Sequence, residues 1–219
     1  SVTDTEGLHQ IEYMTHGAVN DECRSVMRYN YCGIARCNFI LEPKQNNVEF
    51  ASKEVILAEA KFLRAFYYFE LVKFFGAIPL VIDERLGVQQ VSELSRTPKE
   101  QVYAQIESDL QDAVATLSWT SESSHSGIKG RVDKGAALGL LGKVYLYQEK
   151  WSLAAGTLDQ IINSNYYVLT PDYTDIFLKE NENNAETIFD IEFSADEGGS
   201  YGCLICLEGN LTPGYQGIR

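Results

Sequence analysis

The sequence predicts a mainly α-helical fold of stacked antiparallel helices, followed by a loop-rich, partly β C-terminal tail. Three observations favour this fold. Apolar residues recur every three or four positions through most of the stretch from Asp21 to Asn165, which is the period of an amphipathic helix. Proline and glycine punctuate these periodic stretches. After Asn165 the pattern changes to Tyr-rich and Asp/Asn-rich sequence, so we expect helices to give way to loops.

The first two long helices have clear ends. A periodic stretch begins at Asp21 and stops near Pro43, because proline cannot continue a helix. The next stretch lies between Ser52, the expected N-cap, and Gly76, the expected stop signal. Its apolar residues cover more than one face, so we expect this helix to be buried on two sides.

A third long helix is expected after a short extended segment. Residues 78–82 form an apolar run that is too short for a helix. Thr97, Pro98 and Glu100 then form the pattern of an N-cap, a proline at the first helical position and an acidic residue that completes a capping box. We therefore expect this helix to begin with Thr97 as its N-cap.

The rest of the chain is predicted to hold a helical pair and one strand. The helices are expected at about 132–149 and 151–163. In the tail, Phe189, Ile191 and Phe193 alternate with acidic residues, which predicts a strand.

The helical pair has the spacing of a tetratricopeptide repeat over residues 138–161. Gly142 and Ala154 are small, so we expect the two helices to cross closely there. Trp151 and Tyr145 are expected to fill the space at the turn. One such hairpin cannot bury its faces alone, so neighbouring hairpins must stack on it into a tetratricopeptide-like α/α superhelix.

Five blocks of the sequence resemble a known family. The blocks are AEAKFLRAFYYF (58–69), FFGAIPLV (74–81), RVDKGAAL (131–138), IINSNYYVL (161–169) and NENNAETIF (181–189). Together they are similar, in the same order, to blocks of the SusD/RagB family of outer-membrane nutrient-binding lipoproteins. The resemblance implies a SusD-like helical domain over residues 1–195, with 196–219 as the start of a more variable portion.

The resemblance also implies a place and a function. The protein would be lipid-anchored on the extracellular face of a Bacteroidetes-type outer membrane. It would bind an oligosaccharide or another nutrient noncovalently and deliver it to a SusC-like TonB-dependent transporter. No catalysis and no cofactor are implied, and membrane contact would come only through a lipid anchor outside this chain.

Exposed aromatic rings are the expected glycan contacts, because they stack on the apolar faces of sugars while polar groups bind the hydroxyls. Most aromatic residues fall on helical stripes and are expected in the core. Outside those stripes, Tyr13, His16 and Asn20 precede the first strong helix, and Trp119 begins a Ser-rich loop. These four residues are the predicted ligand contacts; the simpler interpretation is that they are ordinary loop residues.

Charge and motifs argue against several other functions. The net charge of −13 repels the phosphates of nucleic acid. No nucleophile elbow, P-loop or dinucleotide fingerprint occurs. Cys203 and Cys206 lack the second pair that a structural zinc site of this spacing needs, so no metal site is predicted.

Arg64 and two cysteines have simple structural interpretations. Arg64 interrupts an apolar helix, and we expect a carboxylate such as Glu59 or Glu70 to hold it. Cys32 and Cys37 lie on a helical segment and are expected in the core.

Two alternative functions remain open from the sequence. A tetratricopeptide adaptor would bind a partner peptide in a concave groove, and it would show regular repeats of about 34 residues. A glycan-processing enzyme domain would turn over a glycan when purified.

Overall fold

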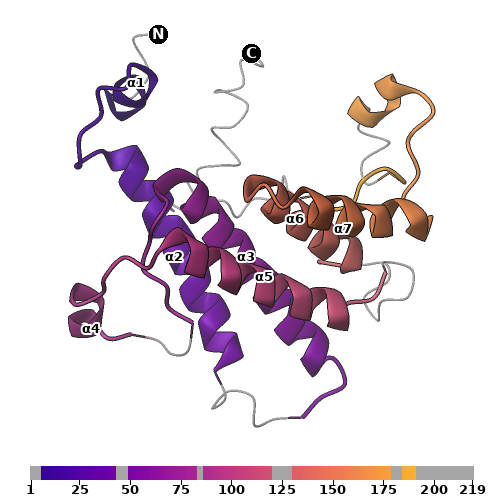
Figure 1. Cartoon of the computed structure of the whole chain (residues 1–219), viewed down its shortest axis with the longest axis horizontal. Helices are drawn as coiled ribbons and strands as arrows, with labels where there is room; N and C mark the ends of the chain where they lie inside the picture. Colours follow the sequence, from indigo (N-terminus) through magenta and orange to yellow (C-terminus); the bar gives the residue numbers. More distant parts are fainter. Residues whose placement is uncertain (1–5, 43–48, 83–85, 120–129, 179–183, 191–219) are drawn as a thin grey trace, which may run out of the picture.

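The computed structural model describes residues 6–42, 49–82, 86–119, 130–178 and 184–190. Seven α-helices and one 3-10 helix lie in these residues (Figure 1). They are α1 (Glu6–Glu12), α2 (Asp21–Leu41), α3 (Lys53–Phe75), α4 (Val88–Ser92), α5 (Lys99–Thr116), α6 (Lys134–Tyr147), α7 (Trp151–Ser164) and the 3-10 helix η1 (Tyr173–Phe177). Within these ranges, no helix combines the length and apolar character needed to cross a membrane.

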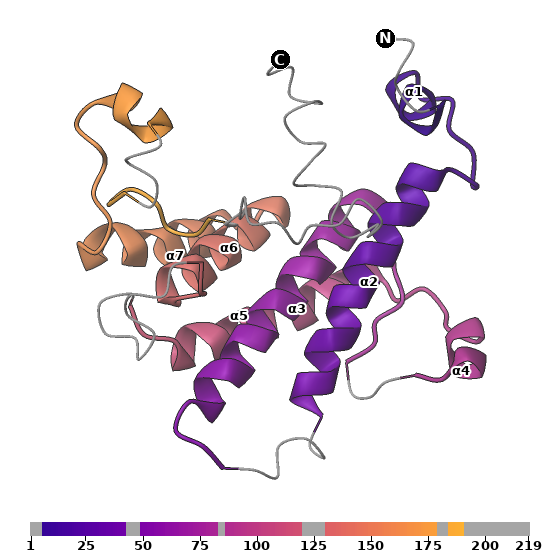
Figure 2. The same cartoon turned by 180° about the vertical axis from the view of Figure 1, so that it is seen from behind.

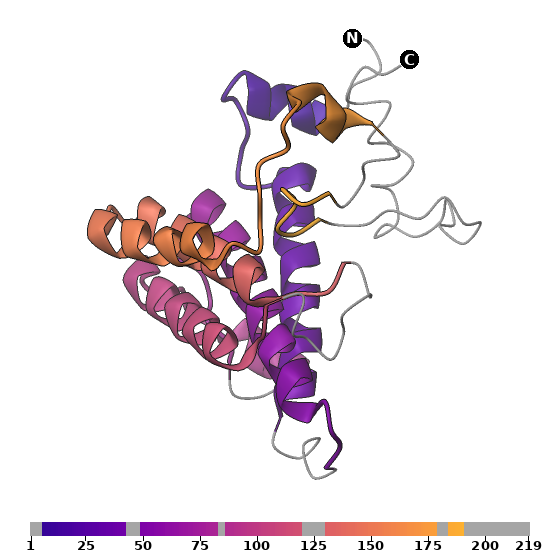
Figure 3. The same cartoon turned by 90° about the vertical axis from the view of Figure 1, so that its right-hand side faces the viewer.

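Helix α3 lies at the centre of the array. It packs against α2 and α5, while α6 packs on α5 and α7 packs on α6. Figure 2 shows the same order from behind. In Figure 3, α5, α6 and α7 lie on one side of the α2–α3 pair. The long helices therefore stack as a row, which confirms the prediction of a mainly α-helical fold.

The burial of α3 follows from its composition. Ala65, Tyr68 and Leu71 are fully buried within it, and they share one core with Ile106 and Leu110 of α5. Because α2 and α5 both pack on α3, the prediction that this helix is buried on two sides is confirmed.

Helices α6 and α7 form the antiparallel pair that the repeat spacing predicts (Figure 1). A Cβ atom on Gly142 would lie 2.6 Å from Cδ2 of Leu158. Ala154 of α7 is also buried. The small residues are therefore found where the two helices approach each other closely.

The turn of this pair differs from the prediction. Tyr145 is buried and its hydroxyl accepts a hydrogen bond from Gln111 Nε2 at 3.1 Å, but Trp151 is 61% exposed. The prediction that Trp151 fills the turn is wrong. Side chains on a helix lie over the turn that precedes them, and Trp151 is the first residue of α7, so it has no earlier turn of its own helix to cover.

Helix α5 begins one residue later than predicted. Its N-cap is Pro98 and its first residue is Lys99. Thr97 instead exchanges two backbone hydrogen bonds with Ile78, at 2.8 and 3.2 Å. The predicted N-cap is wrong because this isolated β-bridge holds Thr97 in the extended segment that precedes the helix.

The predicted strand in the tail finds no support in the described residues. Phe189 has no regular structure, and its ring contacts Phe62 of α3 edge-on, with the centroids 5.6 Å apart. The other expected strand residues, Ile191 and Phe193, and the whole portion 196–219 lie outside the described residues.

Candidate ligand-binding site

The connection between α1 and α2 carries the first three predicted ligand contacts. Tyr13 is 70% exposed, and His16 is exposed as well. Met14 holds a positive φ of 55°, a value that L residues rarely adopt. The connection thus presents an aromatic ring and an imidazole to solvent.

Asn20 has a different place from the other two. It is buried at the N-cap of α2, where its Oδ1 accepts hydrogen bonds from the backbone N–H groups of Glu22 and Cys23, both at 3.0 Å. Its Nδ2 donates to Gly7 O at 3.0 Å and to Gln10 Oε1 at 3.2 Å. An Asn amide has two donors and two acceptor positions, so the fold uses all of them to join α1 to α2.

Trp119 follows α5 and belongs to an aromatic cluster. Its ring stacks on Tyr166, with centroids 5.1 Å apart and planes 12° apart, and meets Tyr167 edge-on at 6.4 Å. Lys134 Nζ lies 5.8 Å from the Trp119 ring centroid, a cation–π geometry. The ring is only half-exposed, so part of the surface expected to receive a sugar is covered by other side chains.

Tyr167 connects this cluster to the start of α6. Its hydroxyl donates to Asp133 Oδ2 at 2.7 Å, and Asp133 Oδ1 accepts the backbone N–H of Ala136 at 2.8 Å as the N-cap of α6. A Cβ on Gly135 would lie 2.2 Å from the Tyr167 hydroxyl oxygen. These contacts pack the aromatic cluster against the start of α6. The sequence predicted Trp119 as an exposed residue at the start of a loop, whereas the fold holds it in this cluster.

The four predicted contacts fall in two separate places. Among the helices of the described residues, α1 packs only on α2. Trp119, in contrast, contacts residues from the start of α6 and from the segment after α7. Figure 1 shows α1 and the end of α5 at opposite sides of the molecule.

A buried polar network holds α2, α3 and α5 together. Arg64 donates to both carboxylate oxygens of Asp109 at 2.8 Å, and its Nη1 donates to Asn38 Oδ1 at 2.9 Å and to Ile82 O at 3.0 Å. Burial acts to lower the pKa of Arg64, but the hydrogen bonds and charge of Asp109 outweigh it and raise the pKa. The prediction that Arg64 has a structural partner is confirmed.

The predicted partners of Arg64 are wrong. Glu59 forms an ion pair with Arg131, and Glu70 bonds Lys73 Nζ at 2.6 Å. Asp109 was missed because it lies 45 residues away on another helix, and helical periodicity cannot tell which carboxylate the stack brings to a buried arginine.

The same network binds the extended segment 79–82 through the backbone carbonyl groups of the segment. Tyr31 donates to Pro79 O at 2.6 Å, Tyr68 donates to Val81 O at 2.8 Å, and Asn38 Nδ2 also donates to Val81 O at 2.8 Å. Burial raises the pKa of Tyr68 to about 12. The Tyr68 hydroxyl therefore stays protonated at neutral pH and remains a hydrogen-bond donor.

The cysteines and histidines that the structure describes are not grouped into a metal centre. Burial raises the pKa of the Cys37 thiol to about 11, against an opposing effect of Arg64, so this thiol stays protonated and unreactive. Cys32 is exposed, so its predicted place in the core is wrong. In the described residues, no three His, Cys, Asp or Glu side chains are grouped to hold a metal ion. Cys203, Cys206 and His125 lie outside those residues.

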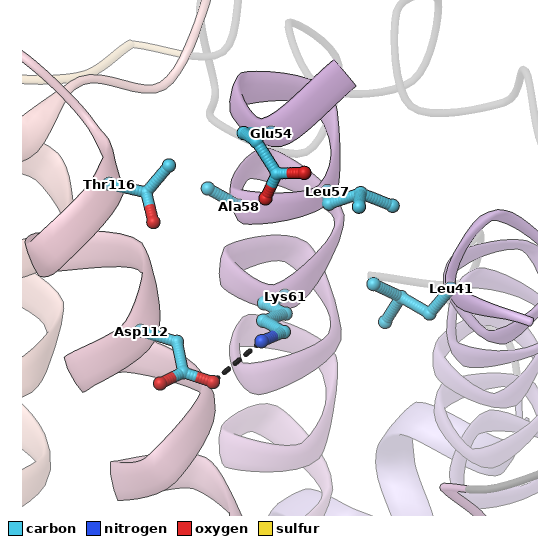
Figure 4. Close-up of a pocket in the computed structure, with 7 residues that line it drawn as sticks. All are labelled: Leu41, Glu54, Leu57, Ala58, Lys61, Asp112 and Thr116. Carbon is cyan, nitrogen blue, oxygen red and sulfur yellow. Dashed lines mark hydrogen bonds and ion pairs between the residues drawn. The ribbon is translucent and has the colours of Figure 1, made fainter. Parts of the chain in front are cut away.

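One pocket of about 250 Å³ lies over the first turns of α3 (Figure 4). Leu41 of α2 and Leu57 of α3 face each other on one side, and Asp112 and Thr116 of α5 lie on the other. Lys61 Nζ is 2.6 Å from Asp112 Oδ2 across the pocket. Sequence reasoning did not find this site, because its residues come from three helices and form no motif.

The comparison with known families decides the identity of the fold. The model of a SusD-like family, described as starch-binding and associating with the outer membrane, matches residues 5–146 of the 219. The chain belongs to the SusD-like family. This confirms the resemblance of the sequence blocks. The family is one of outer-membrane-associated carbohydrate-binding proteins.

Relatives of this SusD-like chain are longer proteins. SusD-like protein P25 of Formosa agariphila is 28% identical over 187 residues, which cover 84% of this chain and 34% of the relative. A SusD-like protein from Bacteroides fragilis is 29% identical with a TM-score of 0.74, covering 85% of this chain and 37% of that one. A laminarin-binding SusD-like protein is 31% identical with a TM-score of 0.75, covering 86% and 41%. The SusD-like chain thus spans about a third of the length of the curated relatives it matches.

Proposed function

We propose that this chain is part of a noncatalytic glycan-binding protein at the outer face of an outer membrane, anchored there through a lipid. It would capture an oligosaccharide and hand it to a TonB-dependent transporter of the SusC type. The observation that carries the proposal is the match of residues 5–146 to a family described as starch-binding and associating with the outer membrane. The likeness to a laminarin-binding SusD-like protein favours a glycan over other nutrients.

The proposed ligand contacts are Tyr13 and His16, with Trp119 as a separate one. Tyr13 offers an exposed ring for stacking on a sugar face, and His16 offers a hydrogen-bonding group three residues later. Asn20 would support them indirectly, because its four hydrogen bonds fix the connection that carries both. Trp119 would contact a ligand with the part of its ring that Tyr166 leaves open.

Glycan binding by the purified protein tests this proposal. Laminarin and starch are titrated by calorimetry into the wild type and into Tyr13→Ala. We expect the variant to bind about three- to tenfold more weakly, since one stacked ring contributes roughly 0.5–1.5 kcal/mol. Tyr173→Ala is the matched control, because Tyr173 is 73% exposed on η1 but lies outside the proposed site. Equal loss in both variants would contradict the assignment of Tyr13.

The delivery step needs a separate experiment. Affinity-tagged protein is recovered from solubilised outer membranes, and the co-purifying proteins are identified by mass spectrometry. We expect a TonB-dependent transporter among them; recovery without one contradicts the delivery step. Glycan cleavage by the purified protein would instead support the enzyme alternative, and saturable peptide binding without glycan binding would support the adaptor alternative.

A further inference from the structure

The pocket over the first turns of α3 is remote from the proposed contacts at Tyr13 and His16. Leu41, which borders it, ends α2, whereas Asn20 caps the other end of this 21-residue helix. At 1.5 Å per residue the two ends are about 32 Å apart. A small ligand in this pocket would therefore not touch the α1–α2 connection.

The pocket offers two kinds of surface. Leu41, Leu57 and Ala58 form an aliphatic wall. The Asp112 and Glu54 carboxylates provide acceptors, whereas the Lys61 ammonium group and the Thr116 hydroxyl provide donors (Figure 4). The Lys61 side chain is 32% exposed and the Asp112 side chain 53%, so both charged groups are accessible to a ligand while they stay paired.

These surfaces restrict the chemistry of the ligand. Two carboxylates against one ammonium group repel an anion. A purely apolar ligand would cover the ion pair and leave its remaining hydrogen-bonding positions unsatisfied. A neutral ring with C–H groups on its face and hydroxyls on its edge meets both surfaces. At about 250 Å³ the pocket is smaller than the roughly 300–1,000 Å³ of drug-sized sites, so it suits one ring.

We infer that this pocket binds a single neutral saccharide ring, with the Lys61–Asp112 ion pair and Thr116 on its hydroxyls and Leu41 and Leu57 on its face. This rests on the proposed function, since it gives a glycan-binding protein a second contact with its ligand. The aliphatic wall lacks the aromatic ring that makes sugar stacking strong, so a free monosaccharide binds here weakly and the site acts together with others on a longer glycan.

Leucine methyl resonances of the purified protein test the inference. D-glucose, D-galactose, D-mannose and D-xylose are added separately to leucine-labelled protein, and the Leu41 and Leu57 methyl signals are followed. At least one sugar is expected to shift both signals saturably. Asp112→Asn removes the ion pair and one charged acceptor, so we expect the Kd to rise at least about tenfold. Asp159→Asn, on the exposed surface of α7, leaves the Kd unchanged.

A second variant separates binding from folding. Thr116 is exposed, so Thr116→Arg fills the pocket while the midpoint of thermal unfolding stays at its wild-type value, and the shifts of Leu41 and Leu57 are lost. If no sugar shifts these signals, or if the shifts persist in both variants, the pocket is not a saccharide site. If the pocket fails this test but the wild type still binds laminarin or starch, only the inference about the pocket is contradicted. If the wild type binds no glycan at all, the inference and the proposed function are both contradicted.

Discussion

Two contacts between helices in this chain are built in opposite ways. Where α3 meets α5, Arg64 and Asp109 form a bidentate ion pair whose side chains are 7% and 3% exposed. Where α6 meets α7, Gly142 lies directly against the Leu158 side chain. The first contact depends on directed hydrogen bonds, and the second depends on the close fit of apolar groups.

The difference follows from what each contact must position. The α6–α7 pair joins two regular helices, whose backbone hydrogen bonds are already satisfied, so close packing suffices. The α3–α5 contact lies beside the extended segment 79–82, whose carbonyl groups need donors. Arg64, Tyr31, Tyr68 and Asn38 provide them. A polar network is therefore found where irregular backbone is held against the core.

Removing one ion of the buried pair should have the largest effect. Asp109→Ala leaves the Arg64 guanidinium buried without its carboxylate, and the free energy of unfolding should fall by about 3–5 kcal/mol. Urea denaturation measures this through the midpoint of the transition.

The double variant Arg64→Met with Asp109→Leu sharpens the comparison. It replaces both ions by apolar groups, so we expect it to be more stable than Asp109→Ala alone. The directed bonds to segment 79–82 are still weakened, because Ile82 O loses its donor. If Asp109→Ala lowers the free energy of unfolding by less than about 1 kcal/mol, the α3–α5 contact does not depend on its directed hydrogen bonds more than the α6–α7 contact does.

Filling the close approach in the hairpin should have an intermediate effect. Gly142→Leu adds a side chain where even a Cβ would lie 2.6 Å from Leu158 Cδ2, and overpacking of this kind costs about 1–3 kcal/mol. Adding Leu158→Ala to Gly142→Leu should restore part of the loss, because the two positions share one space. A double-mutant cycle by urea denaturation measures the coupling.

Gly139→Ala is the matched control on the same helix. A Cβ there would lie 3.8 Å from Ile161 Cδ1, an ordinary contact, so the change should be neutral or stabilising by up to about 1 kcal/mol through helix propensity. Equal destabilisation by Gly139→Ala and Gly142→Leu would show that the close approach of Gly142 to Leu158 does not cause the loss of stability.

The same contrast explains what the sequence could and could not predict. Periodicity and stop signals depend on neighbouring residues, so the limits of α2 and α3 and the crossing at Gly142 were predictable. Arg64 clearly needed a partner, but the choice of Asp109 depends on how α3 and α5 stack. Trp151 was expected to fill the turn of the helical pair and is nevertheless exposed, since its place in the sequence does not fix where the first side chain of a helix points.

The candidate site was harder to predict than the fold. The exposure of Tyr13 and His16 followed from their position outside any apolar stripe. Asn20 was chosen as a polar loop residue, but an Asn just before a periodic stretch is also an N-cap signal, and the structure places it there. The pocket at Lys61 and Asp112 combines residues 51 positions apart, which no local pattern can indicate.

The smallest predicted effect concerns a directed contact at the edge of the fold. Asn20→Ala removes the cap of α2 and the two bonds to α1, and the free energy of unfolding should fall by about 1–2 kcal/mol. Ser52→Ala is its matched control, because Ser52 occupies the N-cap position of α3 but makes no side-chain cap bond, so we expect a change below about 0.5 kcal/mol. Hydrogen exchange should accelerate in α1 only in the Asn20 variant, since α1 packs on no helix but α2. If the two variants behave alike, the position of a capping residue, rather than the bonds that it makes, decides how much it stabilises this chain.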